Sequence, residues 1–299
     1  MAFWRFYCVV MRSPDGPVRP TVFVILTILL SAPFWWLTRQ GGHLFYMNAL
    51  MWSPAAAAVL ALKFTGGSLS DLGWRGSRWK WLLLAWLTVV GAMFLLSVTT
   101  TITGLTGFPN EDFVQEQTQK LHLPDGTSAT LVVAWYALLA LVVGGIGTGA
   151  AALGEELGWR GFLTVETQRR WGFTISSLVV GGLWGLWHFP LMWGNVPTWY
   201  LCGFMVGIVA YSFAYGWFRL VSGSVWPSVV LHAFHNALFG FYSRAFIFPP
   251  EGDAKEIWLG ESGFVFGTIA VMLATLFWWK RSRAVQAFDG DERSHSTHA

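Results

Sequence analysis

Residues 131–160 read LVVAWYALLALVVGGIGTGAAALGEELGWR, and this stretch decides the class of fold. Its first part, 131–153, contains no Lys, Arg, Asp or Glu. A helix of about 20 apolar residues, rising about 1.5 Å per residue, crosses a hydrocarbon core of about 30 Å. The run is therefore long enough to span a membrane as a helix, and its polar end, GEELGWR, continues directly from it.

Similar uncharged runs occur along the whole chain of 299 residues. Only 12% of the residues are charged, about half of the roughly 25% usual in soluble proteins, and the mean hydropathy is +0.49. This composition excludes an ordinary soluble enzyme and a disordered regulator. The runs that we interpret as membrane spans are 21–38, 44–62, 81–103, 131–153, 171–193, 198–218, 224–243 and 262–279.

The sequence therefore predicts an all-α fold, a polytopic membrane bundle with about eight transmembrane helices. We expect a cytoplasmic N-terminal segment at 1–20, the bundle at 21–283 and a disordered cytoplasmic tail at 284–299, where no hydrophobic periodicity is present. Membrane lipid is the first partner that this organisation implies.

The positive charges predict how the bundle is oriented. An even number of spans places both termini on one side. That side, with the loops after the second, fourth and sixth spans, holds 15 of the 19 Lys and Arg residues. Because positive residues collect on the cytoplasmic side, we expect a multi-pass protein of the cell membrane with both termini cytoplasmic. The net charge of +3 reflects this distribution, and we expect no nucleic-acid partner.

Polar residues inside the predicted spans are few. A charged side chain at membrane depth costs about 2.5–3.5 kcal/mol on insertion scales, so such residues usually serve a function. The alternative is that they only satisfy one another between helices. They lie in three short stretches, GEELGWR at 154–160, LWGLWHFP at 183–190 and LHAFHNAL at 231–238, and comprise Glu155, Glu156, Arg160, His188, His232, His235 and Asn236.

The first two stretches are predicted to face each other. Glu155 and His188 are equally far along the chain from the polar break at Arg169–Gly172, so on adjacent antiparallel helices they lie at matching depth. The fourth helix must then extend to about residue 168. Four small residues just before Glu155 would let neighbouring helices approach closely: Gly144, Gly145, Gly147 and Gly149.

Spacing within the stretches separates the residues by role. Glu156 and Arg160 stand at i and i+4, the favourable orientation for a helix ion pair, whereas Glu155 points about 100° away and is left available. In the third stretch His232 and Asn236 share a face, and His235 at i+3 leaves open which histidine faces the site.

A carboxylate and an imidazole that face each other in a low-dielectric site can remove a proton from water. A second histidine and an amide one turn apart can donate to a developing oxyanion. This combination suits hydrolysis of an amide bond. The sequence contains neither the HExxH of zincins nor the Glu-x-x-His pairs of di-iron bundles.

The three stretches resemble the EExxxR, FxxxH and HxxxN motifs of the CPBP family, the CAAX proteases also called the Abi family. The resemblance covers about residues 70–240 and begins with LSDLGWRGSRWKW before the third span. One departure is Trp184, which stands where the family commonly has Phe.

The resemblance implies an intramembrane endopeptidase in which Glu155 and His188 activate water while His232 and Asn236 support the oxyanion. Glu156 and Arg160 would organise the site, and Trp184 would line the substrate pocket. The substrate would be a membrane-associated peptide or protein, with CAAX-type proteins among the candidates. The family is often labelled metalloprotease, and Glu155, His188 and His232 could hold a divalent metal such as zinc with an open position for water. They could equally work without metal.

Two other classes of function stay open at this point. One is a non-catalytic membrane scaffold or immunity-type protein of the same fold, although the complete set of motif residues argues against it. The other is a proton-coupled transporter that uses the buried Glu and His as a relay. A transporter would be expected to show symmetry between its halves, which this sequence lacks.

Overall fold

The computed structural model describes residues 18–41, 44–124, 126–250 and 253–296, and most of the expected N-terminal segment lies outside these ranges. Throughout the described part the chain is helical, with a single isolated bridge between Gly107 and Ile247 as its β-structure. The long helices are α2 (Val18–Arg39), α3 (Leu44–Thr65), α4 (Trp79–Ile102), α5 (Glu111–Lys120), α6 (Ala129–Leu139), α7 (Gly145–Glu156), α8 (Thr164–Met192), α9 (Thr198–Ser222), α10 (Trp226–Ala245), α11 (Phe264–Trp279) and α12 (Arg281–Ser296).

Four short segments connect or interrupt these helices. Two are 3₁₀ turns, η1 (Leu69–Leu72) and η4 (Ala254–Trp258). The other two are π-helical, η2 (Ala140–Gly144) and η3 (Leu157–Leu163), and they join α6, α7 and α8 into one helical stretch over Ala129–Met192.

The helices are those of a multi-pass membrane protein. Five are long and apolar enough to cross a membrane, or six if α11 and α12, bent by 54° to each other, count as one span. Each predicted run overlaps a helix, but the run 131–153 is divided among α6, η2 and α7, and the stretch Ala129–Met192 counts once. The all-helical membrane fold is confirmed, and the count of eight stays a prediction.

Gly172 turns the chain inside α8. Its φ of 69° and ψ of 177° lie outside the helical region, and this positive φ favours glycine because a side chain would be strained there. The turn falls at the polar break expected from the sequence. It lets the two parts of α8, before and after Gly172, run in different directions.

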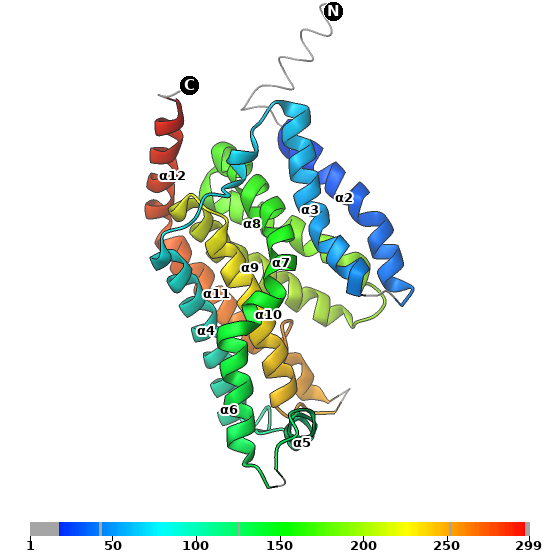
Figure 1. The fold of residues 1–299 in the computed structure, drawn as a ribbon. Coiled ribbons are helices and arrows are strands. Elements are labelled where there is room, and N and C mark those ends of the chain that lie inside the picture. The colour runs from blue at the N-terminus through cyan, green and yellow to red at the C-terminus, as the bar shows by residue number, and fades with distance from the viewer. Residues whose placement is uncertain (1–17, 42–43, 125, 251–252, 297–299) are drawn as a thin grey trace, which may run out of the picture.

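Helices α9 and α10 form the centre of the bundle (Figure 1). Helix α9 packs against α8 and α11, while α10 packs against α4 and α7. In contrast, α2 and α4 carry exposed apolar side chains such as Leu29 and Phe94, as expected of helices that face lipid. The start of α2 and helix α12 lie at one end of the molecule, and α5 lies at the other (Figure 1).

Two of the four glycines expected to permit close helix packing do so. A Cβ on Gly144 would stand 2.7 Å from Ala237, and one on Gly145 would stand 2.4 Å from the Phe234 ring, both on α10. Gly147 and Gly149 face open space instead. Closer to the motif, a Cβ on Gly154 or Gly158 would collide with the backbone of α3, so this helix also lies directly against α7 and η3.

The expectation of a disordered tail from residue 284 is wrong for the described residues, because α12 continues to Ser296. Ala284 and Phe288, one turn apart, are buried in the hydrophobic core. Glu292 forms two hydrogen bonds with Arg169, at 3.0 and 2.7 Å. The tail has too few apolar residues to show a strong sequence pattern. Ala284 and Phe288 nevertheless share one helix face, and the ion pair between Glu292 and Arg169 holds the helix against the bundle.

Candidate active site

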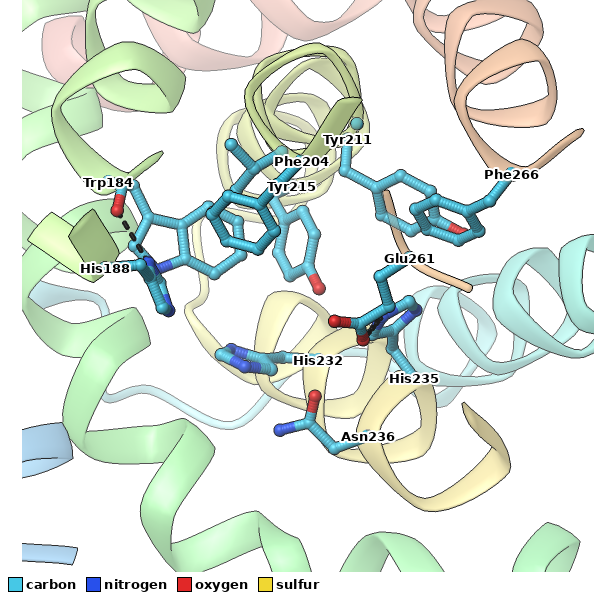
Figure 2. A pocket seen from close by; sticks show the side chains of 12 residues that line it. Trp184, His188, Phe204, Tyr211, Tyr215, His232, His235, Asn236, Glu261 and Phe266 are labelled. Atoms are coloured by element: carbon cyan, nitrogen blue, oxygen red, sulfur yellow. Dashed lines mark hydrogen bonds and ion pairs between the residues drawn. The ribbon is translucent and has the colours of Figure 1, made fainter. Parts of the chain in front are cut away.

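The second and third motif stretches meet around one small cavity, and the first stretch lies behind its wall. The cavity has a volume of about 90 Å³, and its wall includes His188 from α8, His232 and Asn236 from α10, and aromatic side chains from α9 (Figure 2). A water occupies about 30 Å³ in the liquid, so the cavity has room for more than one water-sized group. Residues of the second and third stretches thus line the same cavity, and their role in a shared site stays a prediction.

Glu156, Arg160 and His232 form a buried network behind this cavity. Glu156 Oε1 accepts hydrogen bonds from Arg160 NH1 at 2.9 Å and from His232 Nδ1 at 2.8 Å. The side chains of Glu156 and Arg160 are fully buried, so the ion pair compensates two charges that would otherwise be very costly there. The predicted i, i+4 pair is present, and it also orients His232.

The Arg160 guanidinium is held by further contacts. It lies over the rings of Trp184 and Tyr215, 4.1 and 4.2 Å from their centroids, and NH2 donates to Ser212 Oγ at 3.3 Å. Cation–π contacts of this kind gain strength where water is excluded. Arg160 therefore connects η3 to α8 and α9.

Trp184 connects Glu155 and His188. Its indole Nε1 donates to Glu155 Oε2 at 2.7 Å, and its main-chain oxygen is 2.8 Å from His188 Nδ1. Glu155 is buried and contacts the cavity-lining Trp184 rather than lining the cavity itself. Helical periodicity predicted no partner for Glu155, and the family resemblance placed Trp184 in the substrate pocket. The indole N–H joins the two residues.

The hydrogen bond between His188 and the Trp184 carbonyl shows which ring nitrogen of His188 carries the lone pair. A carbonyl oxygen can only accept, so Nδ1 must carry the proton and donate. In the neutral ring Nε2 is then unprotonated and is free to accept a proton. The Glu155 carboxylate, held by Trp184, lies near the His188 ring.

The π-helical segment η3 begins directly after Glu156 and contains Arg160. One extra residue per turn in such a segment changes which side chains face the neighbouring helices, and π-helical segments often occur at functional sites. The amino-acid pattern gave no sign of this segment.

Glu261 is a residue of this cavity that sequence reasoning missed. It lies in the turn before α11, and its Oε1 accepts from His235 Nε2 at 2.9 Å (Figure 2). Burial alone would raise the pKa of Glu261, but the hydrogen bond from His235 holds it below its ordinary value. The sequence left open which of the two histidines faces the site. His235 binds this carboxylate and lines the cavity beside His232, so both histidines face it.

Glu155, His188 and His232, the three residues that could hold a metal, do not form a metal site in this arrangement. Among the described residues, no three His, Cys, Asp or Glu side chains lie close enough together to hold an ion. Of the three residues considered, Glu155 is bonded to Trp184 and His232 to Glu156. We therefore derive no chemical step through a metal.

Comparison with known proteins finds a family that the central region of the chain matches. Residues 129–238 match the family model described as type II CAAX prenyl endopeptidase Rce1-like. The resemblance to the CPBP family is confirmed. The family is one of membrane proteases, and the matched residues contain all three motif stretches but not Glu261.

A curated relative agrees with this assignment. CAAX prenyl protease 2 of Methanococcus maripaludis is 31% identical over 96 residues, which cover 29% of this chain and 35% of that protein. The match thus spans about a third of the relative.

Proposed function

We propose that this chain is an intramembrane endopeptidase that hydrolyses a peptide bond of a membrane-associated peptide or protein. The observation that carries the proposal is the state of His188: Nδ1 donates to the Trp184 carbonyl, which leaves Nε2 as a base on the cavity wall. Family membership of residues 129–238 supports the same class of reaction.

In the proposed reaction His188 Nε2 accepts a proton from water, and the water oxygen attacks the peptide carbonyl. Glu155 stabilises the positive charge that forms on the imidazole, since its carboxylate is fixed by Trp184 next to His188. The acquired proton can then pass to the leaving amine. CAAX-type proteins are among the candidate substrates.

The proposed oxyanion donors are His232 and Asn236, one turn apart on α10. The Glu156 carboxylate at Nδ1 stabilises a protonated His232, whose Nε2–H can donate to the oxyanion. The Asn236 amide on the same wall supplies a second donor. Donors fixed before reaction in a poorly hydrated site stabilise a transition-state charge most effectively.

The test is to compare the purified wild type with Glu155→Gln and His188→Ala, using activity per folded molecule. Each substitution removes part of the proposed water-activating pair, so we expect cleavage to fall by roughly 10²–10⁴-fold while the protein elutes as a folded species. Membrane proteomics of cells that express Glu155→Gln should show an accumulating uncut substrate.

The matched control is Glu111→Gln, which changes an exposed carboxylate on α5. It should cut at the wild-type rate. Near-wild-type turnover by Glu155→Gln or His188→Ala would refute the proposed mechanism.

A further inference from the structure

The cavity carries a negative charge that the motif residues do not explain. Of the residues that line it in the described structure, Glu261 is the single Asp or Glu, and none is Lys or Arg. The Glu156 charge is already balanced by Arg160 behind the wall. Glu261 thus faces the reaction space with a charge that no Lys or Arg of the described cavity wall balances.

The fold brings this carboxylate to the cavity by close backbone approach. Glu261 lies in a turn closed by a hydrogen bond from Gly263 N to Gly260 O at 3.2 Å. A Cβ on Gly203 of α9 would stand 1.9 Å from the Ser262 carbonyl oxygen, so a larger residue there would push the turn away. Because Gly203 is a glycine, the turn rests directly on α9.

The hydrogen-bond partner of Glu261 on the cavity wall is His235. Nε2 of His235 donates to the carboxylate, while its Nδ1 is buried without a hydrogen-bond partner. The Glu261 side chain remains 29% exposed and accessible to a ligand.

The remaining wall suits the stem of a long cationic side chain. Phe204, Tyr211 and Phe266 line the cavity beside Glu261, and Tyr211 stacks on Phe266 with centroids 5.3 Å apart. The methylene stems of Lys and Arg pack well along apolar surface while the charged end seeks a polar partner. The Tyr211 hydroxyl is buried without a partner, so a polar group of the wall is also left for a ligand.

We propose that Glu261 determines specificity by binding a cationic group of the substrate, a Lys or Arg side chain close to the cleaved bond. This inference rests on the proposed function, because a preference for certain bonds requires that the chain cleaves peptides.

The experiment uses an equimolar mixture of synthetic peptides with acetylated and amidated ends, so that only side chains carry charge. The full-length protein in detergent cuts the mixture, and mass spectrometry identifies the cut bonds. Wild type should prefer bonds within two residues of Lys or Arg by about tenfold, since a hydrogen bond to a charged group contributes about this factor or more.

The variants separate a specificity role from a structural one. In Glu261→Gln the ratio of cationic to neutral cut sites should fall close to one. Glu261→Asp, which keeps the charge, and Glu111→Gln, which removes an exposed carboxylate elsewhere, should retain the preference. An unchanged ratio in Glu261→Gln, or no cationic preference in the wild type, would overturn the proposal.

A binding measurement distinguishes this inference from the proposed function, because it needs no turnover. Surface plasmon resonance compares a lysine peptide with its norleucine counterpart on immobilised wild type and Glu261→Gln. A lysine preference that is lost in Glu261→Gln supports the inference even if no peptide is cut, in which case the protease proposal alone fails. Equal binding of the two peptides to the wild type would overturn the inference.

Discussion

Trp184 uses its indole N–H, its ring face and its main-chain oxygen for three different contacts. The N–H binds Glu155, the ring lies over Arg160, and the oxygen accepts from His188. A phenylalanine at this position could reproduce the second and third contacts. It could not donate to Glu155, so the indole N–H gives this carboxylate a partner that phenylalanine would not supply.

Trp184→Phe should therefore lower activity without preventing folding. Loss of a hydrogen bond to a charged group costs about 1.5–3 kcal/mol, which corresponds to roughly ten- to a hundredfold if the bond is needed in the transition state. We would measure kcat/KM per folded molecule. The control is Trp217→Phe, which removes a similar buried indole whose N–H binds the Lys280 carbonyl at 3.0 Å. Equal activity of Trp184→Phe and wild type would show that this bond is dispensable.

At the scale of elements, the position of η3, which contains Arg160 of the first motif stretch, depends on a glycine. Gly158, at the start of η3, lies against α3, and a Cβ there would stand 2.4 Å from the Pro54 side chain and 2.7 Å from its backbone. The backbone of Pro54 cannot move aside as the end of a flexible side chain can. The close contact of η3 with α3 therefore requires glycine at this position, and α3 helps to hold the motif residues.

Gly158→Ala should destabilise the protein, because the collision forces η3 away from α3. Overpacking of this kind costs about 1–3 kcal/mol, more than the roughly 1 kcal/mol that alanine gains over glycine in a helix. Gly147→Ala on α7 should have the opposite effect, since its Cβ would meet open space. Thermal unfolding of both variants in detergent measures the difference. Equal midpoints would contradict the packing argument.

At the scale of the whole molecule, the long apolar helices and exposed apolar side chains require a membrane around the bundle. The two ends of the described chain, at the start of α2 and at α12, lie together and opposite α5 (Figure 1). Arg19, Arg169 and Arg170 lie near these ends, and each pairs with Glu166. The sequence predicts that this basic end is cytoplasmic, and the orientation stays a prediction.

The orientation can be tested with single cysteines in a background of Cys8→Ser and Cys202→Ser. Gln115→Cys lies on α5 and Gln286→Cys on α12, and both positions are exposed. If both termini are cytoplasmic, an impermeant maleimide should label Gln115→Cys in intact cells and Gln286→Cys only after lysis. The reverse labelling pattern would place the termini outside.

The sequence by itself determined the helical membrane fold and the family region, because both depend on local features. Uncharged runs such as 131–153 predict helices by length alone, and the pairing of Glu156 with Arg160 follows from helical periodicity. Spacing also indicated that His188 and His232 would share a site, since few polar residues can be placed at membrane depth.

Only the tertiary structure decided which side chains bind one another across helices. The bond from Trp184 to Glu155, the π-helical η3 and the approach of Glu261 to His235 depend on how α3, α8, α9 and the turn before α11 pack. Such contacts join residues far apart in the chain, and no local period encodes them. The same reason explains the ordered tail, where Ala284, Phe288 and Glu292 gain stability from the bundle rather than from their own helix propensity.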